Sequence, residues 1–182
     1  MKILIWPGHH DPVDALIKFF THGRGAHAAF LRDDDATIHE AFLPRLRERS
    51  VLPRDRRLAE VFALEGVTRH QHRQFEHLFD SNLRRHIRYS VEDLVRFALN
   101  WPSRDEHHTF CSRYVLFCLH AVLPEEQMPL VRLPAGDWAS PRDLRISPRL
   151  HLLRGYLKGK TRSTTKQQRN KLPKFPLGCF VT

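Results

Sequence analysis

The sequence predicts an α+β domain in which an antiparallel sheet packs against helices. Short strand-like runs dominate the first third of the chain, and segments with helical periodicity follow from Thr68 onward. The two kinds of element form separate blocks and do not alternate, which is typical of an antiparallel sheet with helices packed against it. With 182 residues, of which 41% are hydrophobic, the chain is long and apolar enough for one domain with its own core.

The first elements are a strand, a helix and a hairpin. Residues 2–6 form a short apolar run that ends at a Pro-Gly turn, and residues 13–22 carry apolar side chains at helical spacing. Two strand-like runs, 26–32 and 36–42, flank an acidic triplet. This pattern predicts a hairpin whose turn is longer than two residues.

The middle of the chain changes from strand to helix. Residues 43–57 are rich in Pro and Arg and are predicted to wrap the surface, and 58–64 is a further strand candidate. Thr68 is suited to cap a helix. Five apolar residues after it fall on one face, which predicts a buried side for that helix: Phe75, Leu78, Phe79, Leu83 and Ile87.

A second helix is predicted after Ser90, because Ser90 and Asp93 have the spacing of a capping box. It is expected to end near Trp101. Its predicted buried residues are Val91, Leu94, Val95 and Ala98. Beyond Pro124 the chain is predicted to be loop, with a last short helix over 150–157.

A third helix is predicted within residues 107–123, with Val115, Cys118, Leu119 and Val122 on one continuous apolar face. Thr109 is suited to cap it, which places Cys111 at the second helical position. There, unpaired backbone N–H groups and the positive end of the helix dipole favour a thiolate. An unpaired cysteine is nevertheless more often a packing residue, and Cys118 is predicted to be core.

A nucleophilic cysteine needs a base and a group that orients the base. His27 lies on a predicted strand between alanines, which leave room for a neighbouring element. His39 and Glu40 lie on the partner strand and point to opposite faces. One of them is therefore expected to meet His27 across the hairpin, and the other to reach solvent.

Three patches together resemble the permuted papain-like cysteine hydrolases, the YiiX/YebB-like relatives of the NlpC cell-wall peptidases. They are Gly-Ala-His-Ala-Ala-Phe at 25–30, Ile-His-Glu-Ala at 38–41 and Thr-Phe-Cys-Ser at 109–112. In that family a strand histidine comes first, a polar residue follows on the next strand, and the cysteine opens a helix far downstream. The resemblance covers residues 1–145 and implies a permuted papain-like fold.

The resemblance implies a role for each matched residue. Cys111 matches the nucleophile, His27 the base and Glu40 the orienting carboxylate, although some relatives use a histidine where His39 stands. The hairpin turn is one residue longer than usual, and Arg113 occupies a position where relatives commonly carry an acidic residue. The implied enzyme is a peptidase- or amidase-like hydrolase acting on an amide or ester bond. Its implied substrate is a cell-wall peptide or a lipid acyl group, and thioesterase or acyltransferase activity is compatible with the same site.

The net charge of +10 is concentrated in the last 25 residues. Residues 158–182 hold seven basic side chains and no acidic one, so 1–157 carries only +3. We expect 1–157 to be the catalytic domain and 158–182 a flexible tail that contacts nucleic acid, an anionic surface or another polyanion. The alternative function is a catalytically idle binding module that acts through this tail.

Several classes of protein are disfavoured by the sequence. No segment approaches the roughly 20 apolar residues that cross a bilayer, and no signal peptide is visible, so a cytoplasmic protein is expected, with export by another route still open. Three cysteines do not form a disulfide framework. His70, His72 and His77 lack the spacing of a zinc motif, and no cofactor-binding loop is present. The sequence does not indicate the oligomeric state.

Overall fold

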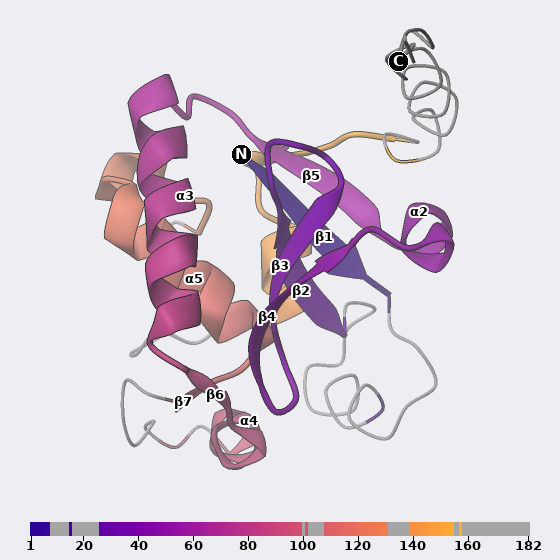
Figure 1. Cartoon of the computed structure of the whole chain (residues 1–182), viewed down its shortest axis with the longest axis vertical. Helices are drawn as coiled ribbons and strands as arrows, with labels where there is room; N and C mark the ends of the chain where they lie inside the picture. Colours follow the sequence, from indigo (N-terminus) through magenta and orange to yellow (C-terminus); the bar gives the residue numbers. More distant parts are fainter. Residues whose placement is uncertain are drawn as a thin grey trace, which may run out of the picture.

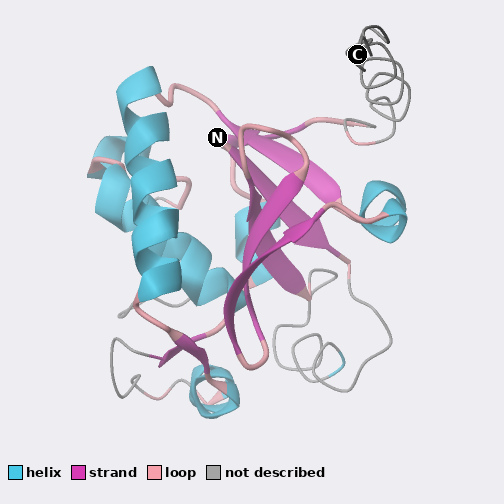
Figure 2. Cartoon of the chain, viewed as in Figure 1, coloured by secondary structure: helices cyan, strands magenta, loops and turns pink. Residues whose placement is uncertain are grey.

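The structure is a computed structural model that describes residues 1–7, 15, 26–99, 101, 108–130, 139–154 and 157. The helix predicted over 13–22 and the tail 158–182 lie outside the described residues, apart from the single position 15. The described part is an α+β fold, as predicted, built on one curled sheet that forms a half-barrel (Figures 1 and 2).

The sheet has eight strands in the order β7-β6-β4-β3-β2-β1-β5-β8. All neighbouring strands pair antiparallel except β6 and β7, which are parallel, so the sheet is mixed and not purely antiparallel as predicted. The strands are β1 (Lys2–Trp6), β2 (His27–Leu31), β3 (Thr37–Phe42), β4 (Arg45–Ser50), β5 (Glu60–Leu64), β6 (Arg88–Tyr89), β7 (His108–Thr109) and β8 (Leu150–Leu152).

The longer helices α3 and α5 lie together against one face of the sheet (Figures 1 and 2). Thr68 caps α3 as predicted, since its side chain accepts a hydrogen bond from the backbone N–H of Gln71. The described helices are α2 (Pro53–Leu58), α3 (Arg69–Arg84), α4 (Val91–Ala98), α5 (Cys111–Val122) and α6 (Pro141–Arg145), with a 3₁₀ turn over Glu125–Gln127. None of the described helices is long and apolar enough to cross a membrane.

The sheet is buried on both faces, and the alternation of side chains along β2 assigns each residue to one of them. Ala28 and Phe30 join the large core that contains α3 and α5, including Phe75 of α3 and Val115 of α5. On the opposite face a smaller core includes Leu4, Trp6, Ala29, Leu31, Ile38, Val61 and Leu157. Strands β1 and β2 are thus apolar on both sides, which makes them the rigid centre of the domain.

Two predictions about the chain course are wrong. Residues 43–57 do not wrap the surface: they form β4, which pairs along its whole length with β3, and then α2. The helix predicted over 150–157 is wrong, because Leu150–Leu152 is the edge strand β8 beside β5. The three elements β6, β7 and α6 were not predicted either, and the first two are only two residues long.

The prediction of what α4 buries is partly wrong. Leu94 is buried as predicted, at 3% exposed, and packs with Phe110. Val91 and Val95 instead face outward, with 41% and 38% of their surface exposed. Helix α4 therefore contacts the domain through one side and presents an apolar side outward.

Candidate active site

Cys111 is the first residue of α5, and the residue that caps this helix is Phe110, not Thr109 as predicted. The reason is that Thr109 belongs to β7, where its carbonyl accepts a hydrogen bond from the N–H of Ser90 over 2.7 Å. The helix therefore begins one residue later than predicted, and Cys111 is its first residue and not its second. The backbone N–H of Cys111 is still one of the first-turn donors that have no partner within the helix.

His27 and Glu40 meet across the hairpin. This is one of the two predicted arrangements, in which either Glu40 or His39 contacts His27. His27 opens β2, Glu40 lies in β3, and 2.9 Å separates His27 Nε2 from Glu40 Oε2. The Glu40 side chain is 1% exposed and the His27 side chain 15% exposed, so this contact is shielded from water. A carboxylate that holds Nε2 fixes the orientation of the imidazole ring.

Cys111 lies near His27, because its side chain is one of the groups that raise the pKa of this imidazole, and the three predicted site residues are thus brought together. Glu40 occupies Nε2, so Nδ1 is the ring nitrogen that stays available to a second partner. Burial by itself lowers the pKa of His27, but the hydrogen bonds to Cys111 and Glu40 and the charges of both raise it to about 10. The surroundings of His27 thus favour the protonated, cationic form of its ring.

Two arginines of β4 hold the other oxygen of Glu40. Arg47 Nε and Arg49 Nε donate to Glu40 Oε1 over 2.9 and 2.7 Å. Burial raises the pKa of Glu40, but its hydrogen bond to His27, the His27 charge and Arg49 together lower it to about 2. Glu40 is therefore a fixed anion behind the imidazole ring.

The charged network continues from Arg49 to a second buried carboxylate. Arg49 Nη2 donates to Asp55 over 3.2 Å, and Asp55, at 1% exposed, also accepts from the indole N–H of Trp6. The Trp6 ring lies 5.2 Å from the ring of His27, and Phe42 meets His27 edge-on at 5.8 Å. Side chains that the sequence did not single out thus surround the imidazole on several sides.

His39, the alternative orienting residue, lies on the opposite face of β3 and does not meet His27. Its Nε2 is 2.7 Å from the hydroxyl of Tyr114, and its ring stacks on Phe79 at 4.4 Å. It was expected to reach solvent if Glu40 met His27, but it is fully buried. Burial lowers its pKa to about 4, so it is neutral at pH 7 and serves as a hydrogen-bonded link between β3 and α5.

Access to the sulfur is restricted. Cys111 is only 1% exposed, whereas Phe42 beside His27 is 38% exposed. A substrate therefore reaches Cys111 only if side chains at the site move apart. No group of three or more His, Cys, Asp or Glu side chains among the described residues could hold a metal ion.

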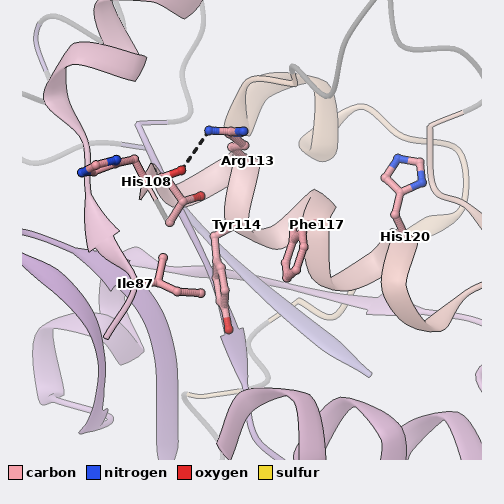
Figure 3. Close-up of a pocket in the computed structure, with 7 residues that line it drawn as sticks. Ile87, His108, Arg113, Tyr114, Phe117 and His120 are labelled. Carbon is pink, nitrogen blue, oxygen red and sulfur yellow. Dashed lines mark hydrogen bonds between the residues drawn. The ribbon is translucent and has the colours of Figure 1, made fainter. Parts of the chain in front are cut away.

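A separate cavity of about 310 Å³ lies along α5 (Figure 3). Arg113 follows Cys111 by two positions and so lies about 200° around the helix axis from it. In the cavity Arg113 donates to the main-chain oxygen of His108 over 2.9 Å and to Asp93 over 3.2 Å. The lining residues are Ile87, His108, Thr109, Arg113, Tyr114, Phe117 and His120. The residue that departs from the family pattern is therefore turned away from the sulfur.

A scan against protein-family models and a search of curated proteins find no match to this chain, so the interpretation of the site rests on its own geometry.

Proposed function

We propose that the protein is a cysteine hydrolase that cleaves an amide or ester bond through an acyl-enzyme. Cys111 is the nucleophile, His27 the base and Glu40 the group that orients His27. The observation that supports this most is the position of His27, which lies near Cys111 at the start of α5 and is hydrogen-bonded to the buried carboxylate of Glu40. The chain order, histidine first and cysteine last, is the one that a permuted papain-like fold requires.

The chemistry follows from these contacts. The thiol proton passes to His27, which gives a thiolate beside an imidazolium, and the Cys111 sulfur of this ion pair attacks the acyl carbon. The backbone N–H of Cys111 stabilises the oxyanion, a type of contact whose loss costs about 3–4 kcal/mol of barrier. His27 then gives its proton to the leaving amine or alcohol, and water releases the acyl group in the second step. Throughout, Glu40 holds the ring in one orientation.

The substrate that fits this proposal is a peptide of the cell wall or an acyl group of a lipid, and transfer to an acceptor other than water is compatible with the same site. We assign catalysis to residues 1–157. The basic segment 158–182 is proposed to contact nucleic acid, an anionic surface or another polyanion.

Acylation with an activated ester tests the proposal. After incubation with a p-nitrophenyl ester of a short fatty acid, intact-mass spectrometry of the full chain should show one acyl group, mapped to Cys111. The variant Cys111→Ala should carry none. Cys118→Ala, which removes a fully buried cysteine on the same helix, should be acylated like the wild type. An adduct that persists in Cys111→Ala, or no adduct at all on the wild type, would refute the assignment.

A catalytically idle binding module is the second candidate, and the 1% exposure of Cys111 favours it. This function predicts no acyl adduct, together with polyanion binding that deletion of residues 158–182 abolishes. The hydrolase predicts the adduct whether or not that segment is present, so the two functions separate in one set of measurements.

A further inference from the structure

Helix α4 and the chain just after it present large apolar side chains to solvent. Val91, Val95 and Leu99 recur at every fourth position, which places them on one side of the helix. They are 41%, 38% and 47% exposed, and Trp101 beyond them is 55% exposed. Leu94, about 100° around the helix axis from Val95, and Asp93, on the opposite side from the stripe, are buried. This outward apolar stripe has no role in the core or in the hydrolase site.

The turn between β3 and β4 extends the stripe. Phe42, the last residue of β3, and Leu43 in the turn are 38% and 43% exposed. The backbone N–H of Tyr89, two residues before α4, donates to the carbonyl of Pro44 over 2.9 Å, so the turn adjoins the start of the helix. Figure 1 shows α4 beside the lower end of the β3–β4 hairpin. We call the six side chains together the apolar surface: Phe42, Leu43, Val91, Val95, Leu99 and Trp101.

Exposed arginines border the apolar surface. Arg45 and Arg88 are paired across β4 and β6, and Arg84 and Arg85 lie at the end of α3, shortly before Arg88. All four are exposed, and none forms an ion pair with a described carboxylate. The exposed acid on α4, Glu92, is already paired with Arg96 at 3.2 Å. The border of the apolar surface is therefore positively charged.

We propose that this surface docks the protein on an anionic phospholipid membrane. Aliphatic side chains and a tryptophan on one side of a helix, bordered by arginines, match the boundary between acyl chains and charged headgroups. Unpaired arginines near such a boundary are attracted to anionic lipid. A nucleic acid would satisfy the arginines but would leave Val91, Val95 and Leu99 in water, which is why the membrane is the better occupant. The surface belongs to the folded domain and is distinct from the basic segment 158–182.

The docking surface is continuous with the proposed active site through Phe42, whose ring contacts His27. Docking would place the site at the level of the headgroups. This position indicates that the substrate is an acyl compound held in the membrane. The assignment of the substrate rests on the proposed hydrolase function. Docking itself does not depend on the hydrolase function, so Cys111→Ala should bind vesicles as the wild type does.

Vesicle sedimentation of the full chain tests the proposal. The protein should bind vesicles that contain phosphatidylglycerol and should bind pure phosphatidylcholine vesicles much more weakly. Val95→Glu should lower the affinity about tenfold, because it places a charge in the apolar stripe. The matched control is Ile146→Glu, which makes the same change at a 64% exposed residue after α6 and should bind like the wild type. The emission of Trp101 should shift to the blue on binding, and Trp101→Phe should remove that shift.

Equal vesicle affinity for Val95→Glu and Ile146→Glu would overturn the proposal, since both variants carry the same charge and the same basic segment. Absence of binding to phosphatidylglycerol vesicles would do so as well. Binding to RNA that Val95→Glu weakens as much as it weakens vesicle binding would point to a polyanion site and against a membrane surface. Circular dichroism of both variants establishes that neither exposed substitution unfolds the domain.

Discussion

Replacing His27 by alanine will slow the acylation of Cys111 by about 10²–10⁴-fold, the range that a positioned acid–base side chain contributes. The variant removes the one ring that contacts both the sulfur and Glu40. The thiol then loses the base to which it gives its proton. The measurement is the rate of p-nitrophenol release at pH 7.5, with the acyl adduct followed by mass spectrometry.

The matched control for this prediction is His39→Gln. His39 lies on the neighbouring strand, but it is hydrogen-bonded to Tyr114 on the far face of β3 and has no contact with His27. A glutamine can retain a hydrogen bond to the Tyr114 hydroxyl. We expect its acylation rate to stay within a few-fold of the wild type. Equal losses of acylation rate in His27→Ala and His39→Gln would mean that both substitutions act only by destabilising the fold. The assignment of His27 as the base would then be wrong.

The second large effect concerns the stability of the fold. Glu40→Ala will lower the free energy of unfolding by about 3–5 kcal/mol, because it leaves buried positive charge without its partner. Glu40 is 1% exposed and balances Arg47, Arg49 and His27. Urea unfolding at pH 7 measures the loss. Glu60→Ala, which breaks a half-exposed pair with Arg145, should cost less than about 1 kcal/mol. Similar losses of unfolding free energy in the two variants would contradict the claim that the buried charges around Glu40 stabilise the fold more than an exposed ion pair does.

The pH dependence of this stabilisation has a definite sign. The pKa of Glu40 is lowered from 4.5 to about 2, so its contribution is complete above about pH 4.5 and is lost as the pH falls through 2. The pKa of His27 is raised from 6.5 to about 10, so its contribution is complete below pH 6.5 and is lost as the pH rises through 10. The difference in unfolding free energy between the wild type and Glu40→Gln should therefore be largest between about pH 4.5 and 6.5 and should shrink toward pH 2.

The sequence was sufficient to predict the elements that local patterns of apolar, turn and capping residues define. The hairpin that carries His27 and Glu40, the cap at Thr68 and the apolar face of α5 all follow from spacing alone. The contact between His27 and Glu40 was one of two possibilities, because alternation places one of His39 and Glu40 on the face of His27 without indicating which.

Strand β4 could not be predicted from hydrophobic periodicity. Its sequence, Arg-Leu-Arg-Glu-Arg-Ser, has one buried apolar residue, Leu46. The strand is stabilised by backbone pairing with β3 and by the ion pairs of Arg47 and Arg49 with Glu40, which form only once the two strands are paired. The burial of His39 has the same origin, since its partner Tyr114 is 75 positions away.

The most direct test of the central claim is the reaction of Cys111 with iodoacetamide at pH 7. An ordinary cysteine is only a few per cent thiolate at this pH, whereas a thiolate held beside an imidazolium reacts without prior loss of a proton. The account predicts that Cys111 in the folded wild type is alkylated faster than the thiol of an unstructured peptide, and that His27→Ala removes this advantage. Alkylation of Cys111 no faster than that of the fully buried Cys118, or a rate unchanged by His27→Ala, would contradict it.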